Sequence, residues 1–541
     1  MLSAAVGLWA GYDRDGALAI FDNPVGWRKF WGLVLAALVY LLLAGLRTRA
    51  ALRWAVGVLA GIGAATGLYL IATHDWGLSP ADWEAFTALG RALQLGRIPA
   101  PAPNTNVAGG VLAPLLCLTL GLLLDLRRAP SRWAWLGLLW GTLTALVMTL
   151  SLLITTSRGA WLGVGAALYL TLVWQGLRAR VPPAQQWRKF RAWLARDALT
   201  ILMFLLLPWF RALLAWIPDI ANRQWLAYRG LLLARDFAFT GCGLGSFALP
   251  DAVYAELIHV PTMAYSHALL VDVALEQGIP GAFALLTLWM LAFWRGLWAL
   301  ARRAHDPPPL LVAGLLALLA IALHSLGDNP FGTSAWLPLL WVPVGVVMAS
   351  LRIEGDQPVP AQRRWGGVLG VALFALAGWG AARLGPSLPA AWYANLGAVS
   401  QAQTELPHYN YKQFAALTLD DIRQQQDLSV AESYYRLALT LDPAQPTART
   451  RLAQLALSRG DYDEALFHAQ AAWDAGYRDR VVVMTYSDAL IAHGRIEEGA
   501  ALVRGLPRAA MRLEWQWYRY QSRGDTERTD YTRAALALLE P

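Results

Sequence analysis

Cysteine, lysine and charge are all scarce in this sequence. The two cysteines are Cys117, inside an apolar run, and Cys242, in a glycine-rich stretch, which excludes a disulfide framework or a cysteine-rich metal site. Only three of the 45 basic residues are lysines, so the position of an arginine is more informative than its identity. Charged residues make up 15% of the chain and apolar residues 57%, more apolar surface than one soluble core can bury. Much of the chain must therefore contact lipid.

Several catalytic and ligand-binding motifs are also absent. The sequence has no P-loop, no HExxH zinc motif and no Gly-x-Ser-x-Gly nucleophile elbow. The pairs Asp13/Asp15 and Asp461/Asp463 have the spacing of metal-binding acidic residues, but one stands in an isolated segment and the other inside a repeat. We therefore expect no metal and no cofactor, and we expect no nucleic acid among the partners.

The sequence does contain ten long apolar runs. A helix of about 20 apolar residues crosses the bilayer core. Many tryptophans stand near the ends of these runs, where indole rings favour the headgroup region. The sequence therefore predicts an all-α, polytopic membrane bundle of about ten or more helices. The runs are 28–46, 52–73, 106–125, 133–155, 159–177, 197–217, 280–301, 310–326, 334–351 and 366–383.

Arginine and lysine are divided unequally between alternate loops. One set of loops holds seventeen of them near the ends of the runs, and the other set holds six. Because cytoplasmic loops are the richer in these residues, we assign the first set to the cytoplasm. The turns at 157–159 and 327–333, the long loop 218–279 and everything after 384 are then extracytoplasmic.

The same rule divides the chain into three parts. Residues 28–383 form the predicted transmembrane domain, and 384–541 form an extracytoplasmic domain. The segment 1–27 departs from the rule, because Arg28 and Lys29 follow it at an outer boundary. We interpret this segment as interfacial, or as the remainder of upstream helices that are missing.

The C-terminal domain contains an internal repeat. Ala431, Ala465 and Gly499 are spaced by 34 residues, as are Gly460 and Gly494. This is the tetratricopeptide period, with small residues where two helices of a hairpin approach closely. Such a domain could dock a protein partner, or it could be a spacer or lid on the membrane domain. The predicted repeats are 427–443, 447–476 and 480–507.

Arg158 stands at the start of an apolar run, next to the outer boundary. A cation that faces hydrocarbon is costly, so this guanidinium must find water or an anion. Two interpretations stay open at this point. Arg158 binds a substrate anion, or it extends to the lipid phosphates.

The long outer loop gathers further polar residues, namely Arg223, Arg229, Tyr265 and His267. A histidine that shares a vestibule with arginines is a base beside an anion site, although a lone histidine is more often structural. The glycine-rich stretch 241–247 in the same loop is better explained as a tight packing turn than as a ligand cradle.

His324 and Asp328 end another run on the outer side. The carboxylate could orient the arginines or a histidine. Asp328-Asn329-Pro330 is also ordinary turn chemistry, and both interpretations stay open.

Three motifs follow one another in a recognisable order. Arg158-Gly-Ala-Trp-Leu162 matches an Arg-x-x-x-Leu signature, and an arginine, 223 or 229, precedes the glycine-rich turn. Tyr265-Ser-His267-Ala268 then leads to Glu276-Gln-Gly-Ile-Pro-Gly281. Over most of 100–340 the chain resembles the O-antigen ligase and polymerase superfamily, which includes bacterial protein O-oligosaccharyltransferases. The family asparagine is Ala268 here, and Tyr265 or Ser266 replaces a preceding histidine.

This resemblance implies a glycosyltransferase C-like fold in the bacterial cytoplasmic membrane. The implied reaction is metal-independent, inverting transfer of a glycan from undecaprenyl pyrophosphate to an acceptor hydroxyl. Bidentate guanidinium groups suit the pyrophosphate, and a base of near-neutral pKa suits the acceptor. The implied catalytic residues are His267, Arg223 and Arg158, and the implied pyrophosphate or glycan contacts are Arg229, Tyr265, His324 and Asp328.

Several functions compete with this one. Ligase and polymerase share these motifs, and a protein O-oligosaccharyltransferase would suit a repeat domain that docks proteins. The acceptor could thus be a glycan, a lipid or a protein. A transporter or a membrane scaffold that displays repeats is the alternative of another class. Transporters have polar residues at mid-membrane, whereas here they concentrate at the outer boundary.

Overall fold

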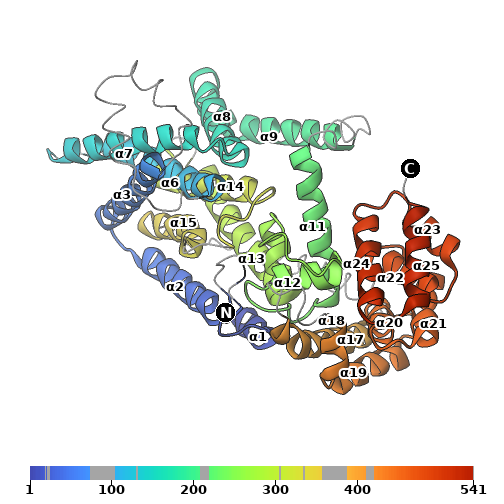
Figure 1. Cartoon of the computed structure of the whole chain (residues 1–541). Coiled ribbons are helices and arrows are strands. Elements are labelled where there is room, and N and C mark those ends of the chain that lie inside the picture. The colour runs from blue at the N-terminus through green and yellow to red at the C-terminus, as the bar shows by residue number, and fades with distance from the viewer. Residues whose placement is uncertain are drawn as a thin grey trace, which may run out of the picture.

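The computed structural model describes residues 1–18, 20, 25–73, 104–129, 132–206, 218–303, 306–332, 336–355, 387–409 and 419–539. Within these ranges every regular element is a helix, which confirms the predicted all-α class (Figure 1). In the described part of the chain, six helices are long and apolar enough to cross a membrane: α2 (Gly26–Gly45), α3 (Arg49–Thr73), α6 (Thr105–Leu126), α7 (Ala134–Ile154), α8 (Arg158–Arg180) and α13 (Leu269–Arg302).

Two further apolar segments are shorter. They are α14 (Pro309–His324) and the pair η3 (Leu337–Trp341) and α15 (Val342–Ile353). Helix α9 (Pro183–Leu206) covers the start of the predicted run 197–217. The rest of that run and all of 366–383 lie outside the described residues, so the total of ten spans stays a prediction. The coarser prediction of a helical, membrane-embedded protein agrees with these apolar helices.

Helix α6 is the centre of the membrane domain. In its most apolar stretch 78% of the residues are buried, against 17–33% in the other five long helices. Small residues allow this central position, because a Cβ at Gly121 would lie only 2.2 Å from the Cβ of Ala313 on α14. Asn104 caps the helix and accepts hydrogen bonds from the backbone N–H groups of Asn106 and Val107. The Asn104-Thr-Asn stretch thus fixes where α6 begins.

Helix α13 is interrupted where the motif Glu276 to Gly281 occurs. Gly278 has a φ of 72°, and Pro280 follows it. The N-terminal helix α1 (Leu2–Ala10) packs against this kink, since a Cβ at Gly7 would lie 2.3 Å from the carbonyl oxygen of Glu276. The glycine-rich turn packs there too, because a Cβ at Gly241 would lie 2.3 Å from the carbonyl carbon of Glu276. The interpretation of this stretch as a tight packing turn is confirmed.

Most of the predicted outer loop 218–279 is helical. It contains α11 (Pro218–Asp236), α12 (Ala248–Pro250), the π-helical turn η2 (Asp251–Ala255) and the first turns of α13. Figure 1 shows α11 and α12 between the membrane helices and the C-terminal helices. Both arginines predicted for this loop, Arg223 and Arg229, therefore occupy fixed positions on one helix.

The C-terminal domain is a stack of helical hairpins. Gly460 and Gly494 end α20 and α22 in left-handed conformations, with φ of 82° and 87°. The 34-residue period therefore marks equivalent turns, while membership of the tetratricopeptide class stays a prediction. The elements are α17 (Ser387–Glu405), η4 (Leu406–His408), α18 (Leu419–Gln425), α19 (Ser429–Leu441), α20 (Pro446–Arg459), α21 (Tyr462–Asp474), α22 (Arg480–Ala492), α23 (Ile496–Val503), α24 (Ala509–Ser522) and α25 (Thr526–Ala537).

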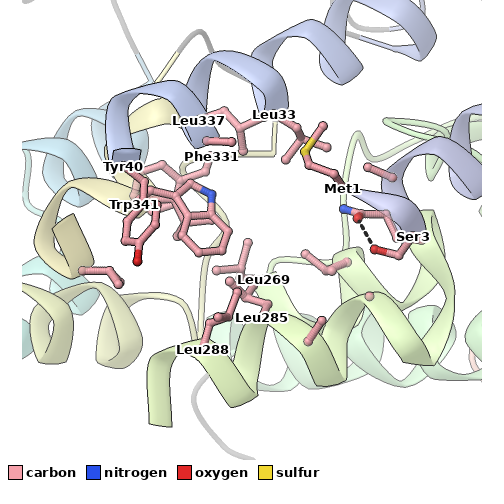
Figure 2. A pocket seen from close by; sticks show the side chains of 18 of the residues that line it. Met1, Ser3, Leu33, Tyr40, Leu269, Leu285, Leu288, Phe331, Leu337 and Trp341 are labelled. Atoms are coloured by element: carbon pink, nitrogen blue, oxygen red, sulfur yellow. Dashed lines mark hydrogen bonds between the residues drawn. The ribbon is translucent and has the colours of Figure 1, made fainter. Parts of the chain in front are cut away.

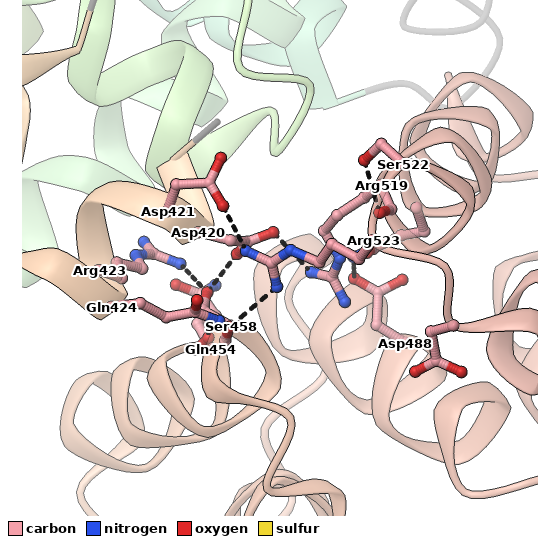
Figure 3. Close-up of polar contacts among 12 residues, drawn as sticks. Asp420, Asp421, Arg423, Gln424, Gln454, Ser458, Asp488, Arg519, Ser522 and Arg523 are labelled. Atoms are coloured by element: carbon pink, nitrogen blue, oxygen red, sulfur yellow. Dashed lines mark hydrogen bonds and ion pairs between the residues drawn. The ribbon is translucent and has the colours of Figure 1, made fainter. Parts of the chain in front are cut away.

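Ion pairs, one buried and one partly exposed, join these helices to one another (Figure 3). Arg519 on α24 lies 3.3 Å from the carboxylate of Asp420 on α18, and Arg523 lies 3.0 Å from Asp421. Burial alone would raise the pKa of Asp420, but Arg519 and the hydrogen bond from Ser458 outweigh burial and lower it. The first and last hairpins are therefore tied together by charge as well as by apolar packing.

The C-terminal domain also contacts the α11 region directly. Arg451 on α20 pairs with Asp236 at 2.9 Å, and Thr447 donates a hydrogen bond to the same carboxylate at 2.7 Å. Arg235 pairs with Asp479 at 2.6 Å. Because Asp236 is the last residue of α11, these contacts fix that end of the helix against the C-terminal domain.

Candidate functional site

His267 and Asp328 form the centre of the candidate site. The Nδ1 atom of His267 lies 3.1 Å from Oδ1 of Asp328, across 61 residues of sequence. The imidazole is 19% exposed, while the carboxylate is only 2% exposed. Burial would raise the pKa of Asp328, but the hydrogen bond and charge of His267 lower it below its usual value. The ionised carboxylate can therefore accept a hydrogen bond from the imidazole and orient the ring.

Arg223 approaches the same carboxylate from α11. Its Nη2 atom lies 3.8 Å from Oδ2 of Asp328, and Nη1 donates a hydrogen bond to the carbonyl oxygen of Gly327. The side chain is 35% exposed. One edge of the guanidinium is thus fixed on the 327–328 turn, while the remaining surface faces solvent and is available to an anion.

Tyr265 covers one side of the imidazole. The ring centroids of Tyr265 and His267 are 4.4 Å apart. Burial and the negative charge of Asp328 both raise the pKa of the tyrosine hydroxyl, so the group stays protonated at neutral pH. Tyr265 can therefore donate a hydrogen bond in the site, and it cannot act as the base there.

His324 lies next to the site, and its imidazole packs against two glycines. A Cβ at Gly110 on α6 would lie 2.9 Å from Nε2 of His324, and one at Gly159 on α8 would lie 2.9 Å from Nδ1. The imidazole is 2% exposed, and neither ring nitrogen hydrogen-bonds to another described residue. His324 is therefore placed to support the turn that carries Asp328.

Arg158 begins α8, immediately before the glycine that contacts His324. Its side chain is exposed. The first turn of α8 is fixed at this point, since a Cβ at Gly109 on α6 would lie 2.7 Å from Cβ of Ser157. The structure therefore brings the start of α8 to the same end of the bundle as the 324–329 turn.

Asp272 joins the two segments that carry His267 and Asp328, and sequence analysis missed this role. Oδ1 of Asp272 accepts the backbone N–H of Ser266 at 2.8 Å, and Oδ2 accepts the side-chain amide of Asn329 at 2.6 Å. The carboxylate is 2% exposed. An acidic residue four positions before Glu276 in the first turns of an apolar helix was the available signal.

A second buried acidic residue pairs with the N-terminal segment. The ammonium group of Lys29 donates hydrogen bonds to Glu276 at 2.6 Å and to the carbonyl oxygen of Gly332 at 3.1 Å. Both side chains are about 5% exposed. The contact ties α2 to α13 and to the 328–332 turn, so the N-terminal helices form part of the support of the site.

An elongated apolar cavity of about 470 Å³ adjoins this support. Figure 2 shows side chains of α2, such as Leu33 and Tyr40, across the space from Leu285 and Leu288 of α13. Lys29, Glu276, Asp272 and Asn329 line one part of the cavity, and Arg295 lines another. Beyond the kink, the lining residues Gly281 and Arg295 are separated by roughly 21 Å of helix at about 1.5 Å per residue. The cavity could therefore receive a long apolar chain whose polar end lies near the candidate site.

Arg229 is the one predicted contact residue that the structure does not bring to this site. Six positions along a helix amount to roughly 600° of rotation, so Arg229 and Arg223 face different directions on α11. The Arg229 guanidinium is 1% exposed, pairs with Asp251 at 3.1 Å and also contacts Glu256. The expectation that Arg229 contacts pyrophosphate or glycan is corrected: its buried pairs join α11 to η2.

The assembled groups suit acyl- or glycosyl-type substitution chemistry at an anionic leaving group. A base oriented by a carboxylate lies beside a partly exposed guanidinium, next to an apolar cavity. Among the described residues no group of three or more histidine, cysteine, aspartate or glutamate side chains could hold a metal ion.

No protein-family model, no curated protein and no solved structure matches this chain.

Proposed function

We propose that this protein transfers a glycan from an undecaprenyl-pyrophosphate carrier to an acceptor hydroxyl at the outer face of the bacterial cytoplasmic membrane. The observation that carries the proposal is the His267–Asp328 pair with Arg223 beside it, next to a long apolar cavity. The motif resemblance to O-antigen ligases and polymerases points to the same reaction.

In the proposed reaction His267 is the general base. Asp328 holds Nδ1, so Nε2 takes the proton from the acceptor hydroxyl. The acceptor oxygen then forms a bond to the anomeric carbon as the bond from that carbon to the pyrophosphate oxygen breaks. The electron pair leaves with undecaprenyl pyrophosphate, and the single displacement inverts the anomeric centre. His267 finally returns the proton to water.

The two arginines stabilise the charge that develops on the leaving group. Guanidinium groups bind phosphate oxygens with two parallel N–H donors. Arg223 is held on one edge by the 327–328 turn, so part of its donor set is oriented before substrate arrives. Arg158, exposed at the start of α8, is the second proposed donor.

The apolar cavity supports a lipid-linked donor. Its lining is mostly apolar, while Lys29, Glu276 and Asp272 cluster near the turn that carries Asp328. A polyprenyl chain in this space would leave its pyrophosphate near the 327–329 turn, where Arg223 supplies the positive charge. This arrangement also distinguishes the proposal from a transporter, in which the polar residues would line a path across the bilayer.

A protein acceptor is the second candidate. The C-terminal domain packs directly against the segment that leads to His267, so a protein bound to this domain would lie close to the site.

The test is reconstitution of the purified protein with an undecaprenyl-pyrophosphate-linked oligosaccharide and each class of acceptor. We expect loss of the lipid-linked glycan and formation of one product class: a ladder for a polymerase, a glycolipid for a ligase, a glycoprotein for an oligosaccharyltransferase. A folded protein that leaves the donor intact with every acceptor would refute the proposal.

A further inference from the structure

The segment that precedes His267 is held by side chains of the C-terminal domain. Arg512 on α24 donates a hydrogen bond from Nη1 to the carbonyl oxygen of Leu257 at 2.7 Å. Tyr409 donates its hydroxyl proton to the carbonyl oxygen of His259. Glu256, just before them, pairs with Arg508 at 3.2 Å. Three of the four residues 256–259 thus contact the C-terminal domain.

The backbone of this segment has an uncommon conformation. Leu257 and His259 both have φ of 61°, and His267 has φ of 59°. A side chain crowds the backbone at positive φ, so branched and bulky residues rarely adopt it. Such residues persist where surrounding contacts hold them, and they concentrate at functional sites. The contacts from Arg512 and Tyr409 fall on the two carbonyl groups of the residues concerned.

Only seven residues separate His259 from His267. Because this connection is short, a change in the direction of the chain at Leu257 or His259 would displace the loop that carries the imidazole. At the other end, Asp272 fixes the backbone of Ser266. The His267 loop thus lies between one contact from the membrane domain and a set of contacts from the C-terminal domain.

We propose that the C-terminal domain positions the His267 loop, and that Arg512 is the positioning residue through which it does so. The proposal rests on the proposed function for its catalytic consequence. It gives the C-terminal domain a role in building the site, beyond that of a docking surface or a spacer.

The geometry of Arg512 explains why this residue must be an arginine. Its Nε and Nη2 atoms lie 3.0 Å and 2.7 Å from Oδ2 of Asp488, and the remaining nitrogen reaches Leu257. The side chain is 6% exposed. A lysine has one ammonium group on a flexible stem, so it can retain the pair with Asp488 but cannot also hold the carbonyl group of Leu257 in the same geometry.

Arg423 offers a matched control within the same domain. It is 5% exposed and contacts Glu405 through two nitrogens, at 2.8 Å and 3.3 Å. Its third nitrogen donates to Ser458 at 3.2 Å, so Arg423 lines the same small cavity as Leu257 and His259 without donating to either carbonyl group. Arg423→Lys thus removes an equivalent internal contact of the domain.

The experiment compares Arg512→Lys, Arg423→Lys and the wild-type full chain in the same detergent or nanodisc. Backbone amide hydrogen exchange of residues 257–267 should accelerate about tenfold or more in Arg512→Lys and stay at the wild-type rate in Arg423→Lys. Donor turnover should show a kcat about 10- to 100-fold lower for Arg512→Lys with KM for the donor within about twofold, because a misplaced base slows chemistry without weakening binding.

Unchanged exchange in Arg512→Lys, or equal acceleration in both variants, would overturn the proposal. Accelerated exchange with full turnover would refute the link between this segment and His267. A wild-type chain with no transfer activity would refute the proposed function instead, and the exchange rates would still decide whether Arg512 holds the loop.

Discussion

Gly110→Ala perturbs the candidate site without touching any group of the proposed chemistry. The added Cβ would lie 2.4 Å and 2.7 Å from ring carbons of Pro330 and 2.9 Å from Nε2 of His324. Carbon atoms in contact are normally about 3.5–4.0 Å apart, so the overlap is about 1 Å. A proline ring cannot rotate away as a flexible side chain would. The turn from His324 to Pro330, which includes Asp328, must therefore move.

The size of this movement predicts a larger effect on turnover than on stability. Overpacking of this kind costs about 1–3 kcal/mol, while replacing glycine by alanine inside a helix returns about 0.5–1 kcal/mol. The net loss of stability should be at most about 2.5 kcal/mol. A displacement of about 1 Å in a catalytic constellation can cost 100-fold in rate, so we expect turnover to fall by about 10- to 100-fold.

Gly165→Ala is the matched control for this prediction. Gly165 lies on α8, is exposed, and has no atom within 4 Å of its added Cβ. The control should keep full turnover and a melting temperature at or slightly above that of the wild type. The assay is donor turnover together with thermal unfolding in the same detergent. Full turnover in Gly110→Ala, or equal losses in the two variants, would refute the argument from packing.

The remaining predictions concern charge. Arg223→Lys should raise KM for the lipid-linked donor about tenfold, because the lysine loses the guanidinium edge that binds phosphate; an unchanged KM, measured by donor titration, would remove Arg223 from the anion site. Burial raises the pKa of Asp251 to about 6, although the charge of Arg229 acts in the opposite direction. Between about pH 4 and about pH 6 the unfolded chain therefore holds fewer protons than the folded one. The stability of the wild type should fall as the pH rises through this range. Asp251→Asn lacks this titration, so its melting temperature should rise relative to the wild type over that pH range; a relative fall would show that the Arg229 pair outweighs burial.

The candidate site was largely predictable because its residues follow boundaries that hydropathy reveals. His267, Asp328 and Arg223 were assigned to outer segments, and the structure brings these three side chains together. Tyr265 was predictable for the same reason, since it stands two positions before His267. Segments that leave a bundle on the same side can meet there whatever their separation in sequence.

Arg229 was misplaced because 218–236 was read as a loop. In a loop, a separation of six residues does not fix the relative directions of two side chains. On the helix α11 the same separation places Arg223 and Arg229 on different faces. Apolar residues do not recur at helical spacing along this segment, so its sequence carried no sign of a helix. Contacts with distant segments hold both parts of α11 in place. Its structure is decided by tertiary contacts.

Lys29 and Glu276 show a further limit of local patterns. Their contact spans 247 residues, so no spacing rule reveals it. The pairing does explain why the charge rule failed at the N-terminus. Lys29 is buried and paired with a carboxylate, so it is not a free boundary charge of the kind that the rule counts. Arg28 alone remains exposed there.

The most direct test of the proposed function compares His267→Ala with His493→Ala in the reconstituted transfer assay. His493 is an exposed histidine of the C-terminal domain, 3.4 Å from Asp463, and it takes no part in the candidate site. We predict that His267→Ala lowers glycan transfer by about 100-fold or more, as expected for removal of a general base, while His493→Ala keeps the wild-type rate. Full transfer by a folded His267→Ala protein would contradict the central claim.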